Sequence, residues 1–443
     1  MYNDAMNDRQ KKLNSLGVDI PDVLLPQNTD MQKWAVIACD QFTQDPGFWE
    51  KIKTTAGGSP SALNLIFPEV YLPDPQPQER IKDIHLTMKR YLDEGVFKET
   101  GKGFIYIERN TPWSKTRRGL VAAVDLERYD WHSDSRPLIR CTEGTVPERL
   151  PARMDIRRGA PLELPHVLLL IDDDTDSLLP PLGDIVIKEE PLYSTPLMMN
   201  SGHVTGWFLN KQEALSLLTE ELDKLCLRSL TRYEGGKPFL FAVGDGNHSL
   251  AAAKEIWEEY KKNHGFHGTD NPPCRYALVE IENIYDPAVT FEPIHRLVFD
   301  IGFEGIKSLL SQLPDFSCTN ADSVQELSKE ICIKSERTRM GVICEGRYAL
   351  VETSASGIST AALQPLLDSA VKNGKPLSVD YIHDEKELLR LTNNHDAGIL
   401  LPPVEKSGLF ETVGRFGPLP RKSFSMGHSL EKRFYMESRR ILV

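Results

Sequence analysis

The chain has 443 residues, of which 40% are hydrophobic and 26% are charged, and its formal net charge is −12. This composition is ordinary for a soluble globular protein of two or three domains, or of one large elaborated domain, and the excess of acid disfavours a broad nucleic-acid-binding surface. No apolar run approaches the length of a membrane-spanning helix, and the acidic N-terminus does not resemble a signal peptide, so we expect a cytoplasmic protein.

The cysteines are scattered, and no two of them have the Cys-x-x-Cys spacing. Their odd number and wide separation argue against a disulfide framework and against a zinc ribbon. We therefore expect free thiols in a reducing compartment. The residues are Cys39, Cys141, Cys226, Cys274, Cys318, Cys332 and Cys344.

The first third of the chain predicts several α/β elements. Residues 34–39 are apolar and predict a strand, which is followed by Asp40. Polar residues just past the carboxyl end of a strand often bind ligands in α/β sheets, but Asp40 has the alternative role of capping the next turn. Residues 79–91 predict a helix, and residues 103–109 and 118–126 predict paired strands.

A charged loop follows at residues 137–153, where Glu143, Thr145 and Arg149 lie close to Gly144 and to prolines. The Gly-Thr-Val-Pro run excludes a helix interior. Because proline restricts a loop and can hold its polar groups in place, the segment favours a functional site, in which Arg149 could bind a carboxylate or phosphate in two-pronged fashion. The alternative is an exposed loop whose Arg–Glu pairs contribute little.

Residues 164–171 predict a buried strand that leads into Asp172, Asp173 and Asp174. Carboxylate oxygens suit Mg²⁺, although such a run of acids more often forms a solvated turn. Beyond it, a short strand is predicted within residues 179–187 and a long helix at residues 207–230.

The most informative stretch is residues 239–260. Residues 239–243 predict a buried strand, and residues 250–260 predict a helix with one apolar face. Between them, a strand–turn–helix arrangement would expose backbone N–H groups at a positive helix end, where phosphate or carboxylate binds well. Asp245 could bind a metal or accept a proton, and Asn247 or Ser249 could cap the helix. The alternative is an ordinary turn. The residues of this turn are Gly244, Asp245, Gly246, Asn247, His248 and Ser249.

Two further candidates lie downstream. His295 and Arg296 interrupt an apolar run; a buried His is more often a satisfied core group, but an unpartnered buried Arg is strongly destabilising, which favours a role for at least one of them. Lys422 and Ser423 lie in a basic segment that suits a phosphate as well as it suits a surface loop. Between these candidates, residues 301–401 predict a more variable α/β part.

At these residues a resemblance emerges. The turn resembles the Asp-Gly-(Asn/His)-His-Arg-x-x-Ala-Ala motif of the ParB/sulfiredoxin superfamily, in which the turn and the helix start hold nucleotide phosphates. The whole chain more closely resembles a bacterial family, domain of unknown function 1015 (DUF1015). Matching stretches, besides the turn, are residues 34–43, 142–149, 293–296 and 419–424.

Two positions depart from the superfamily pattern. Ser249 stands where the motif usually has Arg, so a guanidinium that would clamp phosphate is missing there. Asn247 stands where sulfiredoxins have a Cys, which disfavours a sulfiredoxin reaction.

The resemblance implies a mixed α/β (α+β) fold with a ParB/sulfiredoxin-like core and large insertions. It also implies the activity of free-serine kinases, with ATP or ADP and Mg²⁺ as cofactors and with Glu143 as the base on the substrate hydroxyl. We assign no metal ligands. The expected catalytic residues are Glu143, Asp245 and His248, and the expected substrate- or phosphate-binding residues are Thr145, Arg149, Gly244, Gly246, Asn247, Ser249, His295, Arg296, Lys422 and Ser423.

We expect an N-terminal α/β part at residues 1–135, a ParB-like core at 136–300 and a C-terminal α/β part at 301–443, packed on the core. The leading function is a nucleotide-dependent phosphotransferase acting on a small hydroxyl substrate such as free L-serine, with no membrane partner. The alternative is a non-catalytic regulator that binds a nucleotide or metabolite, which Ser249 favours. A ParB-like DNA binder or nuclease is disfavoured by the net charge.

Overall fold

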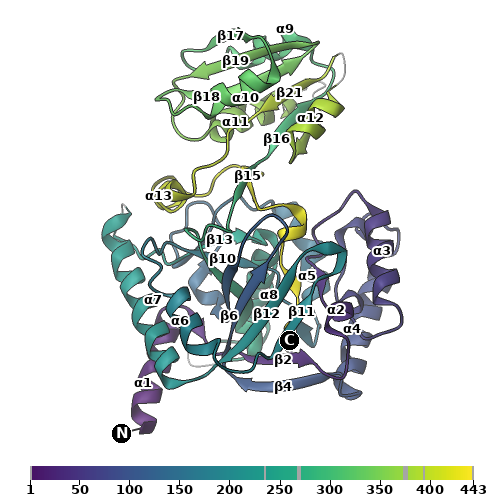
Figure 1. Cartoon of the computed structure of the whole chain (residues 1–443), viewed down its shortest axis with the longest axis vertical. Coiled ribbons are helices and arrows are strands. Elements are labelled where there is room, and N and C mark those ends of the chain that lie inside the picture. The colour runs from purple at the N-terminus through teal and green to yellow at the C-terminus, as the bar shows by residue number, and fades with distance from the viewer. Residues whose placement is uncertain (1, 234–235, 267–270, 373–377, 393–394, 442–443) are drawn as a thin grey trace. The chain divides into compact units, whose positions relative to one another are not determined.

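The computed structural model describes residues 2–233, 236–266, 271–372, 378–392 and 395–441 (Figure 1). Contacts between residues divide the chain into two compact units. Unit 1 comprises Met1–Val289, Phe410–Pro418 and Gly427–Val443, and unit 2 comprises Thr290–Leu409 and Leu419–Met426. The chain therefore leaves unit 1 and returns to it, so that the C-terminal residues complete the unit in which the chain begins.

Unit 1 is built on a large mixed sheet. Among its described residues, ten strands form this sheet in the order β11-β12-β5-β6-β14-β10-β13-β8-β7, with β1 paired to β6. The pairs β14–β10, β13–β8 and β8–β7 are parallel, and the others are antiparallel. The strands are β1 Val18–Asp19, β5 Phe104–Asn110, β6 Arg117–Asp125, β7 Tyr129–Asp130, β8 Ile139–Cys141, β10 Leu168–Ile171, β11 Tyr193–Pro196, β12 His203–Leu209, β13 Phe241–Asp245 and β14 Tyr276–Asn283.

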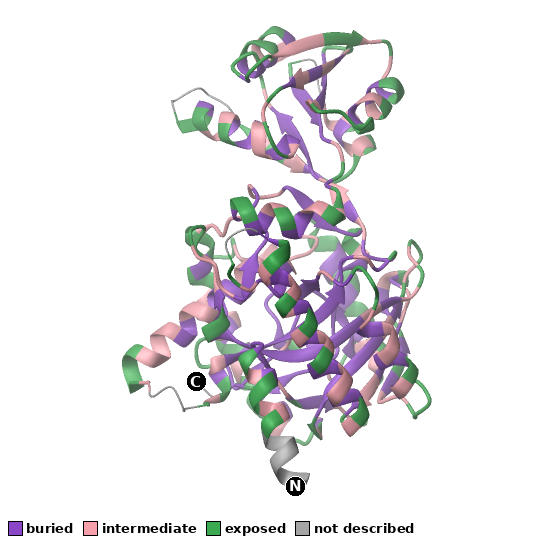
Figure 2. Cartoon of the chain, turned by 90° about the vertical axis from the view of Figure 1, so that its left-hand side faces the viewer, coloured by how far each residue is buried: buried purple, intermediate pink, exposed green. Residues whose placement is uncertain are grey.

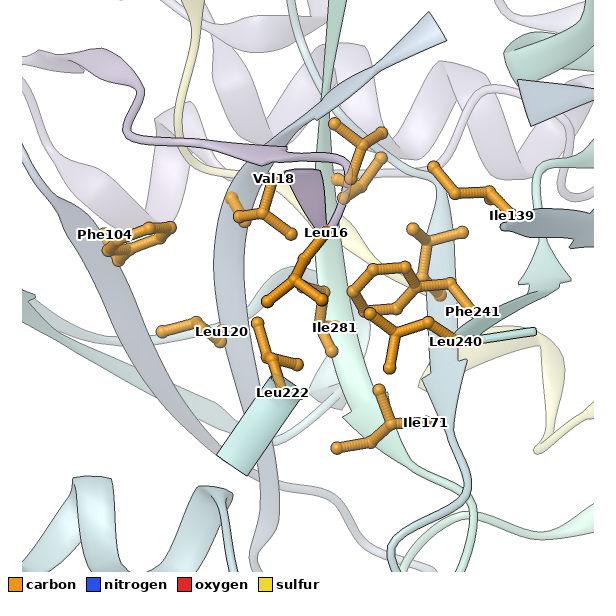
Figure 3. Close-up of a cluster of buried hydrophobic side chains, with 14 of the residues drawn as sticks. Leu16, Val18, Phe104, Leu120, Ile139, Ile171, Leu222, Leu240, Phe241 and Ile281 are labelled. Carbon is orange, nitrogen blue, oxygen red and sulfur yellow. The ribbon is translucent and has the colours of Figure 1, made fainter. Parts of the chain in front are cut away.

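The central strands of this sheet are buried on both faces, which explains the apolar runs of β6, β10 and β14 (Figure 2). In β5, Phe104 and Tyr106 belong to one core cluster and Ile105 and Ile107 to another, because successive side chains of a strand point to opposite faces. Figure 3 shows part of the first cluster, in which Leu222 of α7 lies among residues of the sheet.

Helices cover each face. Four of them contribute to the first cluster: α1 Tyr2–Ser15, α6 Leu179–Val186, α7 Gln212–Arg232 and α8 Asn247–His264. Three contribute to the second: α2 Met31–Trp34, α3 Pro46–Ala56 and α4 Pro77–Asp93. The other helices of this unit are α5 Leu150–Arg157, which packs against α8, and α13 Leu409–Phe416, whose first residue belongs to unit 2.

Short strand pairs attach the last residues of the chain to unit 1. β23 (Phe434–Tyr435) pairs with β3 (Val36–Ile37), and β24 (Arg439–Arg440) pairs with β9 (Leu162–Glu163). A third pair joins β2 (Asp22–Pro26) to β4 (Phe97–Lys102).

Unit 2 contains an antiparallel sheet of six strands among its described residues, in the order β17-β19-β18-β21-β16-β20. Helices α9 and α11 contribute to the core cluster on one face, and α10 and α12 to the cluster on the other. The elements are β15 Phe291–Pro293, β16 His295–Val298, α9 Gly302–Leu310, β17 Ser317–Ala321, α10 Val324–Cys332, β18 Thr338–Cys344, β19 Arg347–Thr353, α11 Ser359–Lys372, β20 Val379–Ile382, α12 Glu385–Leu391, β21 Ala397–Leu400 and β22 Phe424–Met426. β15 pairs with β22 outside this sheet.

The mixed α/β fold expected from the sequence is confirmed, as is the pairing of the strands predicted at residues 103–109 and 118–126. The helix predicted at residues 207–230 is wrong at its start, because residues 207–209 belong to β12 and pair with β5. Aromatic residues favour such a paired strand. The strand predicted within residues 179–187 is instead helix α6, which has proline in its first turn.

The division by contacts differs from the expected three parts. Strands from residues 1–135 and from 136–300 share the large sheet, since β6 pairs directly with β14. Within the described ranges, no helix combines the length and apolar character that crossing a membrane requires.

Candidate functional site

Four chain segments meet at one edge of the large sheet. Strands β8 and β13 are parallel neighbours, so the segments that leave their carboxyl ends, residues 142–149 and 244–249, emerge at the same edge. β10 runs antiparallel to β13, with Leu168 opposite Asp245, so the residues that precede β10 reach this edge as well. The fourth segment is residues 431–437, near the C-terminus. We call these segments together the polar edge.

The turn between β13 and α8 is tighter than the sequence predicted. β13 continues through Asp245, and α8 already begins at Asn247. Gly246 is the N-cap, with φ of 79°, and a Cβ there would lie 3.0 Å from the Cα of Val167. The predicted capping by Asn247 or Ser249 is therefore wrong: for this helix the described residues provide no side-chain cap. A left-handed glycine turns the chain sharply enough without one.

This turn is not sealed in the core. Gly246 is buried, but Gly244 and the other residues of the turn are only half-buried. The Oδ1 of Asn247 and the Oγ1 of Thr145 are both buried and have no hydrogen-bond partner within the part of the chain that the structure describes. Buried polar atoms rarely stay unpaired in a native protein, and such atoms often bind a ligand or a water molecule.

Asp245 forms an ion pair that the sequence did not suggest. Its Oδ2 lies 2.9 Å from the Nζ of Lys432, whose side chain is 6% exposed, and its Oδ1 accepts a 2.8 Å hydrogen bond from the backbone N–H of Gly246. The turn therefore has a buried ammonium group beside it, although the motif Arg is missing from the turn itself.

The loop that follows β8 lies against the turn. The backbone N–H of Val146 donates a 3.2 Å hydrogen bond to the Nε2 of His248, and the hydroxyl of Thr142 donates one of 2.6 Å to the carbonyl of Val243. Glu143 and Thr145 are half-buried, whereas Arg149 is exposed in the 3₁₀-helix Pro147–Arg149. Thus the structure brings Glu143, Thr145 and His248 to one place and leaves Arg149 at its surface.

Ser249 begins a second chain of polar contacts. Its Oγ lies 2.9 Å from the Nε2 of His166, and the Nδ1 of His166 lies 2.8 Å from the hydroxyl of Tyr435. The backbone N–H of Cys39 donates a 3.2 Å hydrogen bond to the same hydroxyl. His166 and Tyr435 are buried, whereas Ser249 and Cys39, at the two ends of this chain, are half-buried.

An ion pair lies next to that imidazole. Arg153 of α5 donates a hydrogen bond to Glu69, and both side chains are largely buried. Burial raises the pKa of Glu69 above its ordinary value. The charge of Asp40 raises this pKa further, whereas Arg153 and, more weakly, His166 lower it. Asp40, Glu69, Arg153 and His166 are therefore electrostatic neighbours in one polar layer.

Arg433 holds the C-terminal segment across this edge. Its guanidinium bonds to Glu280 and Glu437, and its Nε donates a 3.0 Å hydrogen bond to the carbonyl of Pro165. Burial opposes the charge of Arg433, but the two carboxylates outweigh it and hold its pKa above the ordinary value. This anchor sets the positions of Lys432 and Tyr435, which flank it in the sequence.

The remaining predicted site residues belong to unit 2. Arg296 is fully buried and donates hydrogen bonds to the side chain of Gln364 at 2.9 Å and to the carbonyl of Lys422 at 3.0 Å. The Nδ1 of His295 accepts a 3.1 Å hydrogen bond from the N–H of Leu401. Burial, and after it the charge of Arg296, lowers the pKa of His295 to about 4. Ser423 is buried and donates to the carbonyl of Pro420 at 2.7 Å. These contacts are those of satisfied core groups, and a binding role for these four residues stays a prediction.

The three consecutive acids are engaged by protein groups. Asp173 is fully buried and accepts hydrogen bonds from Thr175, Ser177 and the N–H of Leu178, and Asp174 pairs with Arg228. The run is therefore not a solvated turn, because its middle carboxylate organises the start of α6. Nowhere among the described residues do three or more His, Cys, Asp or Glu side chains form a group suited to a metal ion.

A groove of about 520 Å³ lies elsewhere in unit 1, between α4 and α5. Lys82, Lys89 and Arg158 contribute to its lining, but its surface is open, and Arg158 already pairs with Glu259. We place the candidate site at the polar edge instead, because buried unpaired oxygens, an ammonium group and a helix amino terminus converge there.

Sequence reasoning missed His166, Lys432, Tyr435 and Glu69 as members of this site, although it placed Arg153 in the charged loop at residues 137–153. The one available signal was chemical: a missing motif Arg invites a search for another cation. Nothing local distinguishes Lys432 from the other lysines, since it lies 187 positions from its partner Asp245 in the numbering of the chain.

Comparison with known proteins identifies relatives of this chain. The family model "Protein of unknown function (DUF1015)" matches residues 23–370, a range that includes His166 and Ser249 but not Lys432 or Tyr435. Among curated proteins, none matches.

Solved structures show a distant likeness. A variant of free serine kinase in complex with ADP is 11% identical, and the match covers 75% of this chain and 97% of that chain with a TM-score of 0.42. A conserved hypothetical protein from Pyrococcus furiosus is 11% identical over 71% of this chain and 94% of that chain, with a TM-score of 0.38. SbnI from Staphylococcus aureus, with a C-terminal truncation, is 11% identical over 69% and 82%, with a TM-score of 0.36.

Proposed function

Because the chain belongs to the DUF1015 family, and because the family match spans both residues 142–149 and residues 244–249, we propose that the polar edge is the active centre of a nucleotide-dependent phosphotransferase. Its substrate is a small hydroxyl compound, and free L-serine is the first compound to test. Its phosphate donor is ATP or ADP.

One observation carries the proposal: a half-buried glycine turn joins β13 to the uncapped amino end of α8. The positive end of a helix dipole and its unpaired N–H groups attract phosphate. α8 has no acidic residue in its first turn to compensate that dipole. Lys432 adds a full positive charge beside the turn, and a buried ammonium is suited to neutralise phosphoryl oxygens.

The roles of the side chains follow from their positions. Phosphoryl transfer needs mainly positioning and charge neutralisation. Lys432, oriented by Asp245, neutralises phosphate charge, and Glu143 accepts the proton of the substrate hydroxyl. His248, held by the N–H of Val146, joins the loop to the turn. The unpaired oxygens of Thr145 and Asn247 are available to donors of the bound ligand.

Mg²⁺ fits this site only together with the nucleotide. In phosphoryl-transfer sites the ion takes phosphate oxygens and water and only one or two carboxylates. Asp245 is the carboxylate at the turn that would share in holding it, with charge neutralisation as the chemistry that the ion supplies.

Thermal shift and turnover assays test the proposal. A nucleotide that binds only the folded chain raises its melting temperature, and L-serine should then stimulate loss of the nucleotide's terminal phosphate. Lys432→Met should weaken nucleotide binding by about 10-fold or more, as expected for loss of one charge-assisted hydrogen bond. Lys211→Met, at an exposed lysine that pairs with Glu189, is the matched control and should bind normally. Undiminished turnover in the double variant Glu143→Ala/Asp245→Ala would contradict the mechanism.

A regulatory function is the second candidate, namely binding of a nucleotide or metabolite without turnover. Two observations favour it: Ser249 replaces the motif Arg, and Asp245 is already paired with Lys432. Tight nucleotide binding without transfer of phosphate to any hydroxyl compound would select this candidate.

A further inference from the structure

We propose that Ser249 is a nucleophile that accepts the phosphoryl group covalently, with His166 as its base and Tyr435 as the residue that positions the base. The proposal deepens the phosphotransferase function and rests on it. It assigns a chemical role to the position at which this chain departs from the superfamily motif. Arg at that position could clamp a phosphate, whereas a serine hydroxyl can form a bond to phosphorus and later release it.

The geometry is that of an activated nucleophile. Such sites place a hydroxyl within hydrogen-bond reach of a base, and a third group orients the base. Here the distances are 2.9 Å from Ser249 Oγ to His166 Nε2 and 2.8 Å from His166 Nδ1 to the Tyr435 hydroxyl. The rings of His166 and Tyr435 also contact each other edge to face, with their centroids 5.6 Å apart, and this contact restrains rotation of the imidazole.

The role of His166 as a base requires the tautomer that carries its proton on Nδ1. The Tyr435 hydroxyl accepts from the N–H of Cys39 and lies 2.8 Å from the Nδ1 of His166. Burial raises the pKa of Tyr435 well above 10, so the phenol keeps its proton. In that tautomer, the phenol oxygen accepts from the Nδ1–H of His166. The Nε2 lone pair of His166 therefore faces the hydroxyl of Ser249.

The amino end of α8 supports the negative charge that develops during the transfer. Ser249 is the third residue of α8, so its Oγ lies in the first turn, where the helix dipole stabilises negative charge on an attacking oxygen or on a phosphoryl group. The ion pair of Glu69 and Arg153 lies beside His166. The nucleophile therefore lies where the helix dipole stabilises the charge that develops on it.

The step balances without any further reactant. The Oγ of Ser249 attacks the terminal phosphorus of a nucleoside triphosphate, and its proton passes to the Nε2 of His166. A bond forms between Oγ and phosphorus, the bond from phosphorus to the bridging oxygen breaks, and the nucleoside diphosphate leaves with that electron pair. In the second step, the hydroxyl of the small substrate attacks the same phosphorus and its proton passes to Glu143. The bond between phosphorus and Oγ breaks, and Ser249 regains its proton from His166.

A second serine–histidine pair of unit 1 provides a matched control. The Oγ of Ser194 lies 3.4 Å from the Nε2 of His203 in the exposed ladder between β11 and β12. Ser194 lies in a strand and not at the amino terminus of a helix, and the buried Tyr193 next to it bonds to Glu437. Proximity to an imidazole alone would make Ser194 as reactive as Ser249, whereas the proposal predicts that only Ser249 reacts.

The experiment incubates the full-length protein with γ-³²P-labelled ATP and Mg²⁺, without any acceptor, and locates the label by peptide mass spectrometry. We expect phosphoserine at Ser249 and a loss of about 100-fold or more in labelling rate in His166→Asn, the usual effect of removing a general base. In the wild type, protonation of the base should lower the labelling rate at acidic pH, and the His166→Asn variant should not show this pH dependence. Tyr435→Phe should change that pH profile, which a purely structural role would leave unmoved. Ser194→Ala should be labelled like the wild type.

The outcomes separate this proposal from the proposed function. Label at Ser249 that L-serine or another hydroxyl compound removes as its phosphate ester supports both. Label at Ser249 that no hydroxyl compound removes supports Ser249 as the acceptor but overturns transfer to a small molecule. Phosphorylation of a small substrate with equal rates in wild type and Ser249→Ala, and without label on the protein, overturns the nucleophile and leaves the phosphotransferase. Absence of both nucleotide binding and label overturns both proposals.

Discussion

Gly246 is the residue on which the geometry of the candidate site depends most directly. It adopts φ of 79°, and a Cβ added to it would lie 3.0 Å from both the Cα and the Cγ2 of Val167. Val167 directly precedes β10, and its carbonyl bonds to the N–H of Glu280, so its backbone cannot easily move away. Substitution Gly246→Ala therefore combines a strained backbone with a steric clash.

The expected cost can be separated into two parts. An L-residue in the left-handed region costs about 1–2 kcal/mol. Overpacking against a fixed neighbour adds about 1–3 kcal/mol, so that Gly246→Ala should lower the free energy of unfolding by about 2–5 kcal/mol. Gly95 is a matched control, because its φ is 68° and a Cβ there meets nothing within 4 Å. Gly95→Ala should therefore show only the cost of the left-handed backbone, about 1–2 kcal/mol.

Urea unfolding of both variants, with hydrogen exchange of α8 peptides to localise the effect in unit 1, measures this difference. The gain from a less flexible unfolded chain is common to both substitutions and cancels in the comparison. Gly246→Ala should also abolish the nucleotide-induced thermal shift, whereas Gly95→Ala should retain it. Equal destabilisation of the two variants would refute the close approach of Val167, and normal nucleotide binding by Gly246→Ala would refute the turn as the anion site.

Three further predictions concern buried polar groups. His295 has a pKa of about 4 in the folded chain against the ordinary 6.5, so between these two pH values the folded state binds fewer protons than the unfolded state. Unit 2 should therefore lose about 3 kcal/mol of stability as the pH falls from 6.5 to 4. His295→Gln should flatten this dependence, as measured by hydrogen exchange at different pH values. Arg296→Met leaves several buried acceptors unpaired and should destabilise unit 2 by about 3 kcal/mol or more, whereas the exposed Arg390→Met should leave its exchange unchanged. Thr142→Val removes a buried 2.6 Å hydrogen bond and should cost about 1 kcal/mol in urea unfolding of unit 1; no measurable change would argue against that bond.

Sequence patterns predicted elements whose residues interact locally. The hairpin of β5 and β6 was recognisable because two apolar runs flank a short polar connection, and α8 was recognisable from its alanine-rich, glycine-free stretch. The start of α7 was not recognisable, because residues 207–209 are compatible with a helix until their pairing with strand β5 is known. The identity of the cap was also missed, because Asn247 and Gly246 are both good N-caps and only the approach of Val167 requires glycine.

The amino-acid sequence by itself determined the mixed α/β class and the family, and it predicted an anion-binding turn at residues 244–249. These conclusions rest on composition, on periodicity and on contiguous motifs, which can be recognised without knowing which segments meet in the folded chain. Tertiary structure alone decided that Lys432 pairs with Asp245 beside the turn, that His166 bonds to both Ser249 and Tyr435, and that His295 and Arg296 are buried in another unit. The physical reason is strand order: parallel and crossing connections bring together side chains from distant parts of the chain, and no local pattern records which strand edge they will share.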